Sequence, residues 1–497
     1  MDLIVKNVIT YSSSGIQDEF SKDILIEGNR IIKIENHSES SKVPAKKIID
    51  GTDKMIIPGL INSHLHSHDR FDKGRIDNLP LELWMVAYNC PLGFRDWKPE
   101  ECYLRTIANC IEQIRSGVTT VIDDVFHSDI TNEDNIDAVF RAYVDSGLRA
   151  RVTIAWSDLP YYKTVPYLEE LVPDGTKIEF DKKALDKKFV LKIWEKFAKK
   201  YDGRICFGIS VSGPQRCSEN FMRDALNFSK EFNLPIYTHV LETKTQQITG
   251  HLRYGMSVVE YLSKEKLISP KTVLIHCVWV TKRDIDLIAE NRSKIVHNPV
   301  SNLKLGSGIA PISEILKANI PVGIGTDNNN CNDSANLLEA IKTAALISKV
   351  TTGNYAKWVG AKEALCMATV SGAKCFDGDG IGELREGYKA DLTLVNIRDL
   401  NYLPKNNRIY QFVYGENGKC IDTVIVDGKV VMEQGNLKTI NVKEVEDKIL
   451  DHQIRISEVI ERASERTNEI LPIVKTAYQR CCNLASVSSL EKQPASI

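Results

Sequence analysis

The sequence contains none of the long apolar runs that a membrane protein needs. No stretch of about 18 apolar residues occurs, and residues 1–7 lack the apolar core of a signal peptide. An excess of charge of one sign is also missing, since 64 basic and 66 acidic residues are interspersed and leave a formal net charge of −2. Such a balance gives no basic surface for nucleic acid. We therefore expect a cytoplasmic protein that binds neither a membrane nor a nucleic acid.

Cysteine motifs are missing as well. The 12 cysteines are scattered, and none has the C-x-x-C spacing that is typical of thiolate metal sites and redox sites. With 43% hydrophobic residues, a chain of 497 residues buries enough apolar surface to fold without disulfides. We expect reduced thiols, most of them buried.

Alternating patterns typical of β-strands occur at both ends of the chain. Residues 23–34 alternate apolar and polar side chains around Gly28-Asn29, which favours a hairpin turn because both residues tolerate a positive φ. Similar runs return between residues 390 and 431. These patterns predict a small β-sandwich that is assembled from both termini, from residues 1–57 and 376–440.

The middle of the chain, residues 58–375, alternates short apolar runs with longer helical patterns. Eight such runs predict an α/β fold, a distorted (β/α)8 TIM-type barrel. Active sites of such barrels lie at the carboxyl ends of the strands, and several runs carry His or Asp at or near that end. The predicted strands are 60–66, 118–124, 149–155, 205–211, 236–241, 273–278, 294–298 and 322–327.

The C-terminal segment, residues 441–497, carries no recognisable chemical motif. A charged helical pattern from residue 442 to 477 predicts a packing helix, and the polar residues 486–497 predict a frayed terminus. The helix could also contribute to a contact between subunits.

Histidine and acidic side chains gather at the predicted strand ends. His64 and His66 are two residues apart in the first barrel strand and point to the same side, so both can reach one metal ion. Later strand ends add His239, His276 and Asp327. Imidazole and carboxylate groups suit Zn²⁺, with Fe²⁺ or Mn²⁺ as alternatives. We therefore expect a divalent metal ion at this rim.

In this order, the motifs resemble those of one family. The chain is similar to the ATZ/TRZ branch of the amidohydrolase superfamily, which holds S-adenosylhomocysteine/methylthioadenosine deaminases, guanine deaminases and triazine hydrolases. The resemblance covers nearly the whole chain apart from its C-terminal residues. It rests on Pro58-Gly59-Leu60, His64-Leu65-His66, His239 with Glu242, His276, His297-Asn298-Pro299, residues 301–306, Gly325-Thr326-Asp327 and Gly382-Glu383-Leu384.

The resemblance implies a role for each polar residue of these motifs. Glu242 would be the proton shuttle, and His276 would orient the attacking water. A divalent metal lowers the pKa of bound water from about 16 to about 7, so hydroxide can attack an sp² carbon at neutral pH. Glu242 could then pass a proton to a ring nitrogen, while His276 and Asp327 assist the departure of ammonia. The implied metal ligands are His64, His66, His239 and Asp327.

A lysine is missing from the fourth predicted strand, where binuclear members of the superfamily place a carboxylated lysine. Here residues 205–211 read ICFGISV. We therefore expect one divalent metal per chain, Zn²⁺ before Fe²⁺ or Mn²⁺, and not a cyclic-amide hydrolase with two metals. Family resemblance also suggests a homo-oligomer, a dimer or larger.

Two residues of the nucleoside deaminases in this family are missing too. Gly93 stands where those enzymes have a glutamate that binds the ribose hydroxyls, and Ser212 stands where they have a histidine that recognises the purine. A site without such hydrogen-bonding groups loses its basis for selectivity, so adenosine-type substrates are not expected. We expect a small nitrogen-rich molecule instead: an amino-substituted heterocycle, an amidine or a guanidine.

Polar residues close to the motifs are the candidate substrate contacts. Asp69, Asp124 and the run Asn328-Asn329-Asn330 could accept hydrogen bonds from such a molecule, although the Asn run could equally serve to turn its loop. The full set is His68, Asp69, Arg70, Trp84, Asp124, Ser212, His297, Asn302 and Asn328.

Two other function classes remain open at this point. A hydrolase of a urea-type amide or of a carbon–chlorine bond would use the same metal site. A non-catalytic scaffold is the second alternative, but scaffolds of this superfamily typically lose ligands, and here all of them are present. The sequence therefore predicts a metal-dependent deaminase, a hydrolase that acts on carbon–nitrogen bonds other than peptide bonds.

Overall fold

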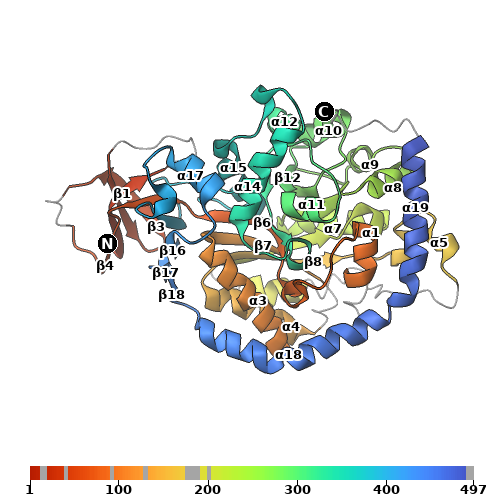
Figure 1. Cartoon of the computed structure of the whole chain (residues 1–497), viewed down its shortest axis with the longest axis horizontal. Helices are drawn as coiled ribbons and strands as arrows, with labels where there is room; N and C mark the ends of the chain where they lie inside the picture. Colours follow the sequence, from red (N-terminus) through yellow and green to blue (C-terminus); the bar gives the residue numbers. More distant parts are fainter. Residues whose placement is uncertain are drawn as a thin grey trace.

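Two bodies of β-structure make up the molecule. The computed structural model describes residues 1–11, 20–38, 43–89, 95–126, 132–173, 191–198 and 203–487. Figure 1 shows a sheet beside the N-terminus at one end of the molecule and a helix-covered barrel at the other. The predicted α/β barrel with a sandwich built from both termini is confirmed.

The barrel is a parallel sheet in the order β13-β12-β11-β10-β9-β8-β7-β6-β14. Because β13 runs directly into β14, and β14 pairs with β6, one stretch of chain joins both ends of this order and the sheet closes. The strands are β6 Leu60–His66, β7 Val118–Phe126, β8 Arg149–Trp156, β9 Ile205–Val211, β10 Ile236–Val240, β11 Thr272–His276, β12 Lys294–His297, β13 Val322–Ile324 and β14 Asp327–Asn328.

The prediction of a single strand over residues 322–327 is wrong in one detail, because the strand breaks at Gly325-Thr326. A Cβ added at Gly325 would lie 2.4 Å from Asn298 Oδ1 and 2.6 Å from the carbonyl oxygen of His64. The backbone is therefore crowded against the first barrel strand at this point, and only glycine fits so close an approach. The break lets β14 turn onto β6.

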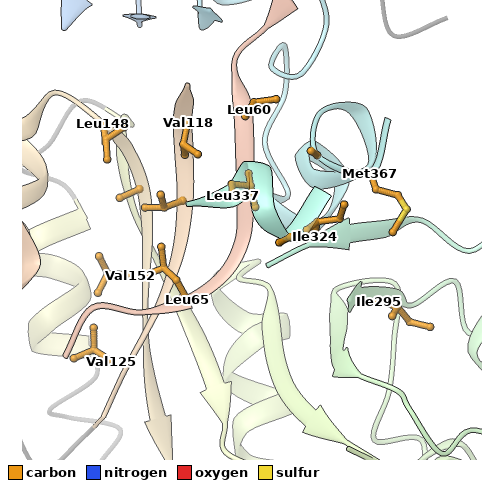
Figure 2. Packing of buried hydrophobic residues seen from close by; sticks show 14 of the residues in the cluster. Leu60, Leu65, Val118, Val125, Leu148, Val152, Ile295, Ile324, Leu337 and Met367 are labelled. Atoms are coloured by element: carbon orange, nitrogen blue, oxygen red, sulfur yellow. The ribbon is translucent and has the colours of Figure 1, made fainter. Parts of the chain in front are cut away.

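Helices cover the outside of the barrel, so the strands are buried on both faces, as parallel sheets require. Figure 2 shows part of the packing, with Leu60, Val118 and Leu148 among the buried apolar side chains. Polar residues begin several helices: the hydroxyl of Ser218, for example, accepts a hydrogen bond from the amide of Phe221. The main covering helices are α3 Pro99–Arg115, α4 Glu133–Ser146, α7 Glu219–Phe232, α8 Lys244–Tyr254, α9 Val258–Lys264, α10 Lys282–Glu290, α12 Ile312–Lys317, α14 Leu337–Ile347, α15 Ala361–Met367, α16 Val370–Phe376 and α17 Arg408–Gly415.

The second sheet joins the two ends of the chain, because β5 pairs antiparallel with β15. The predicted turn at Gly28-Asn29 connects β2 to β3, and Gly28 has a φ of 58°. A buried ion pair between Arg149 and Asp391, 2.7 Å apart, fastens this sheet to the barrel. Its strands are β1 Leu3–Thr10, β2 Lys22–Glu27, β3 Arg30–Asn36, β4 Lys47–Asp50, β5 Lys54–Pro58, β15 Leu392–Asn396, β16 Ile421–Val426, β17 Lys429–Glu433 and β18 Asn436–Leu437.

The C-terminal segment forms two helices, α18 (Val442–Glu465) and α19 (Leu471–Val487), so the prediction of one helix over 442–477 is wrong. A short 3-10 turn separates them, and the chain changes direction so that α19 packs along one side of the barrel (Figure 1). Packing of apolar side chains there overrides the continuous helical pattern of the sequence. None of the helices in the described ranges combines the length and apolar character needed to cross a lipid bilayer.

Helix α19 packs against a short segment at the barrel rim, formed by α1 (Leu81–Trp84) and the π-helical turn at Met85–Asn89. We call the shared apolar core the rim cluster. It brings together three segments that are far apart in the sequence. Its main members are Leu81, Leu83, Trp84, Met85, Tyr161, Val165, Leu168, Ile470, Val474 and Ala477.

Shortening a side chain of the rim cluster should destabilise the protein. Val474 is completely buried, so Val474→Ala should lower the free energy of unfolding by about 2 kcal/mol, from lost apolar burial and the cavity left behind. Ile454 on α18 is 77% exposed, so Ile454→Ala should change stability by less than about 0.5 kcal/mol. Equilibrium unfolding in guanidinium chloride measures both; equal effects of the two variants would contradict the packing of α19.

Candidate active site

The carboxyl ends of the barrel strands have an unusual backbone. Leu241, His276, Cys277 and Asp327 all have left-handed φ values, between 49° and 75°. For residues other than glycine this conformation costs roughly 1–3 kcal/mol each, so the surrounding structure must hold it. His276 and Asp327 line the cavity at this rim together with His66, His239 and Glu242.

Three buried imidazoles converge at the rim. Ring centroids of His64 and His66 are 4.6 Å apart, and His239 lies 5.0 Å from His64 and 5.7 Å from His66. His66 Nδ1 donates to the carbonyl oxygen of Asp124 (2.5 Å), and His239 Nδ1 donates to that of Ser212 (2.7 Å). A neutral imidazole carries one proton, so in both rings Nε2 is left with a free lone pair, as metal ligation requires.

Two carboxylates lie beside these rings. Asp124 can place an oxygen within 4.8 Å of a nitrogen of each of the three histidines, and together they form a candidate metal site. Asp327 also lies close, with Oδ1 3.4 Å from Nε2 of both His64 and His66. Burial would raise the pKa of Asp327, but the neighbouring imidazoles outweigh burial and hold this pKa well below its usual range, so the carboxylate is ionised.

The residues present fit a divalent metal ion. Neither ring nitrogen of the buried His64 has a hydrogen-bond partner, which is rare for buried polar atoms. Burial lowers the pKa of His64 to about 4, and the neutral ring is the form that binds metal. Burial opposes protonation of His66, but the carboxylates of Asp327, Asp124 and Asp69 outweigh burial and raise the pKa to about 9. The negative charge around this ring therefore favours a cation, either a second proton on the ring or a metal ion in its place. Imidazole nitrogen with carboxylate oxygen is a zinc-type ligand set.

Proton-handling groups stand next to the metal cluster. His276 Nδ1 donates to Asn302 Oδ1 (2.8 Å), which directs Nε2 toward Glu242 Oε2 (3.6 Å) and Asp327 Oδ2 (3.7 Å). The Glu242 amide donates to Gln246 Oε1 (2.9 Å), which anchors the turn at the start of α8. Burial raises the pKa of Glu242 to about 7, although the neighbouring His276 opposes this rise. A carboxyl group of this pKa can both take up and release a proton near neutral pH.

A cavity of about 480 Å³, including its open mouth, leads to these groups. Four of the predicted substrate contacts line it: His68, Trp84, Ser212 and Asn328.

Other predicted substrate contacts lie elsewhere. Asp69 accepts hydrogen bonds from Asn329 Nδ2 and the Asn330 amide, so it holds the loop after β14. Arg70 pairs with Glu112, and the two carboxylate oxygens of Asp124 accept from Thr153 and Ser210. His297 is buried outside the cavity lining, and Asn302 reaches it only through His276. Gly93 lies outside the described residues.

Several residues that line the cavity were not predicted from the sequence. Leu81, Met85, Leu305 and Cys331 supply apolar walls, and Arg216 adds a cation. Arg216 follows strand β9 by five residues, so its position after a strand end was the available signal. The apolar residues carry no such signal, because packing alone brings them to the wall.

Comparison with known proteins gives the family. Residues 55–431 match the model of the amidohydrolase family. The chain is 33% identical over 423 residues to a 5-methylthioadenosine/S-adenosylhomocysteine deaminase of Carboxydothermus hydrogenoformans, covering 85% of this chain and 91% of the relative. It is 32% identical over 422 residues to a 5'-deoxyadenosine deaminase of Methanothermobacter thermautotrophicus, covering 85% and 92%.

Solved structures share the fold. A zinc-bound adenosine deaminase of Xanthomonas campestris superposes with a TM-score of 0.81 at 22% identity, covering 92% of this chain and 99% of that one. A zinc-bound atrazine chlorohydrolase of Arthrobacter aurescens gives 0.79 at 22% identity, covering 92% and 100%. The predicted hydrolase class, with its metal-binding barrel rim, is confirmed by the family match and by the cluster at the rim. The chain therefore belongs to the amidohydrolase family.

Proposed function

We propose that the protein is a one-metal deaminase of an amino-substituted nitrogen heterocycle. The observation that carries this proposal is the buried carboxyl group of Glu242, held 3.6 Å from His276 Nε2 beside the three-histidine cluster. A chlorohydrolase need not protonate a ring nitrogen in the same way, whereas a deaminase needs a group that moves protons to the ring and to the departing amine.

We assign His64, His66 and His239 as metal ligands, with Asp327 as the fourth. Both oxygens of Asp124 are already hydrogen-bonded to hydroxyl groups, and its carbonyl oxygen holds His66. By contrast, Asp327 directs one oxygen to the histidine pair and accepts from Ser301 with the other (2.5 Å). Strand β9 has no lysine to bridge a second ion. One ion per chain therefore fits, zinc first, with iron or manganese as alternatives.

The chain's own residues would carry the proton transfers. When bound, the divalent ion would lower the pKa of a water molecule, so that hydroxide is available as the nucleophile at neutral pH. Glu242, whose pKa is near 7, accepts a proton and gives it to the ring nitrogen next to the reacting carbon. His276 is oriented by Asn302, and when its ring carries both protons its Nε2 donates a hydrogen bond to the developing negative charge. Burial of these groups keeps bulk water away.

An aminopurine or aminopyrimidine ring is the substrate class that best matches these groups. The relatives named above are deaminases of adenine nucleosides. Ser212 in this cavity, in place of a purine-reading histidine, favours substrates other than adenosine itself. His68, Trp84 and Asn328 are the proposed substrate contacts. Product analysis distinguishes this class from the alternatives: release of ammonia, an amine or chloride separates deamination from cleavage of a urea-type amide or of a carbon–chlorine bond, and the substrate panel separates heterocycles from amidines and guanidines. Homo-oligomer formation and a cytoplasmic location stay predictions.

The purified protein should contain about one divalent metal ion per chain. His239→Ala should reduce metal content to less than a tenth, since it removes one of the proposed ligands. His251→Ala, on the exposed surface of α8, serves as the matched control and should retain the full content. Elemental analysis measures both variants, and an unchanged metal content in His239→Ala would refute the ligand assignment.

The two carboxylates near the histidines give a sharp test of the fourth ligand. Asp327→Asn should lower metal content and activity together, because the anionic ligand is lost. Asp124→Asn should keep the metal and mainly reduce stability, because Thr153 and Ser210 lose an acceptor. Metal content of the two variants after dialysis against a weak chelator decides between them. If Asp124→Asn lost the metal and Asp327→Asn kept it, Asp124 would be the fourth ligand.

Replacement of the proton shuttle should abolish turnover without loss of metal. Glu242→Gln should lower kcat by about 10²- to 10⁴-fold, the usual contribution of general acid–base catalysis. Glu290→Gln, a 60% exposed side chain, is the control and should be fully active. The assay is ammonia release from a panel of aminopurines, aminopyrimidines and guanidines, with chloride release as a parallel readout. Full activity of Glu242→Gln on its best substrate would exclude the proposed mechanism.

A further inference from the structure

Arg216 stands in the wall of the catalytic cavity, beside residues assigned to the chemistry. It ends the short 3-10 turn Pro214–Arg216 that follows β9. The backbone is fixed there, because the Arg216 amide donates to Gly213 and its carbonyl accepts from Leu159. The side chain lines the same cavity as His239 and Glu242. Its position is therefore set by the barrel and not by a free loop.

The guanidinium of Arg216 has only weak partners. Nη1 donates to Ser212 Oγ (3.0 Å), and Nη2 contacts the thioether sulfur of Met85 (3.3 Å), which is a poor acceptor. Within the part of the chain that the structure describes, no carboxylate lies within 4.0 Å of this guanidinium. Glu82 lines a small adjoining cavity with Arg216, but it does not bond to the guanidinium: its Oε1 accepts from Thr243 (2.6 Å), and its buried Oε2 has no hydrogen-bond partner.

Two fully buried arginines of the molecule pair with carboxylates, whereas a third, Arg151, donates to backbone carbonyls. Arg95 makes two hydrogen bonds to Asp72, at 2.8 and 2.9 Å. Arg149 pairs with Asp391 at 2.7 Å. A guanidinium has five donors in a planar fork that matches a carboxylate, and elsewhere this protein uses that match. Arg216 offers the same fork to a cavity that opens to ligands.

No carboxylate of the described residues is in direct contact with the guanidinium of Arg216, although Glu82 and Glu242 interact with its charge at longer range. A guanidinium keeps its charge at every pH at which proteins fold, and the proposed metal adds two further positive charges in the same cavity. An anionic group on the substrate would offset this repulsion and would also form charge-assisted hydrogen bonds. A neutral substrate would leave the donors to the Ser212 hydroxyl, the Met85 sulfur and water.

We infer that Arg216 binds a carboxylate carried by the substrate, so that the substrate is an amino-substituted heterocycle with an acidic substituent. This inference rests on the proposed function, since it adds a specificity residue to the same site. The amino-bearing carbon faces Glu242 and the metal ligands, while the carboxylate meets the guanidinium across the ring. Trp84 and Met85 supply apolar surface in the same cavity.

Matched ligand pairs test the inference: 4-aminopyrimidine with 4-aminopyrimidine-5-carboxylate, and adenosine with adenosine-5'-carboxylate. Ammonia release gives kcat/KM for each compound, and calorimetry in the metal-loaded Glu242→Gln protein gives the affinities. At least one carboxylated member should be preferred by about 10- to 100-fold, the value of a charge-assisted hydrogen bond. Arg216→Met should bring this ratio close to one.

Arg253→Met is the matched control. Arg253 donates to the carbonyls of Gln215 and Cys217 in the same turn, but it is not part of the cavity lining, so the ratio should persist. Absence of any preference for a carboxylate in the parent protein overturns the inference. An equal fall for both members of a pair, or loss of metal from Arg216→Met, overturns it as well, because Arg216 would then act through Ser212 and His239. Arg216-dependent binding without ammonia release would instead refute only the deaminase proposal.

Discussion

Two hydrogen bonds from imidazole Nδ1 atoms to backbone carbonyls determine what the site can do. They leave Nε2 of His66 and His239 as lone-pair donors that point into the rim. Strand register sets both bonds. Because Leu65 pairs with Asp123, His66 lies beside the carbonyl of Asp124; because Thr238 pairs with Val211, His239 lies beside that of Ser212. The barrel therefore orients these two of the four proposed ligands through its main chain.

A single short helix then connects the metal end to the proton-handling end. Helix α11 (Pro299–Lys304) supplies Ser301, which donates to Asp327, and Asn302, which accepts from His276. These two contacts fix the carboxylate and the imidazole relative to each other across strands β11 and β14. Glu242, raised to a pKa near 7 by burial, completes the set. Such pre-organised hydrogen bonds cost no rearrangement when charge develops in the reaction.

Much of the fold, and the histidines of the candidate metal site, could be predicted from the sequence. Periodicity gave the observed bounds of β6 and β9, and the strand ends identified His64, His66 and His239. Contacts between residues that are far apart in the sequence were harder to predict. Asp69 lies only three residues after His66, yet its carboxylate accepts a hydrogen bond from Asn329, 260 positions later in the sequence. Periodicity tells which face a side chain occupies, but not which distant segment meets it, so Arg216 and the break between α18 and α19 were missed.

The residues of the cavity wall are positioned in a different way from the proposed metal ligands. Strand register positions the ligands, whereas the rim cluster positions Leu81, Trp84 and Met85 by packing them against α19. The two ends meet where Glu82, in the same rim helix, accepts a hydrogen bond from Thr243, the neighbour of Glu242. Residues far outside the barrel thus shape the space above the reactive groups. Substrate selectivity can therefore change through packing in this cluster while the ligand geometry, held by the main chain, stays the same.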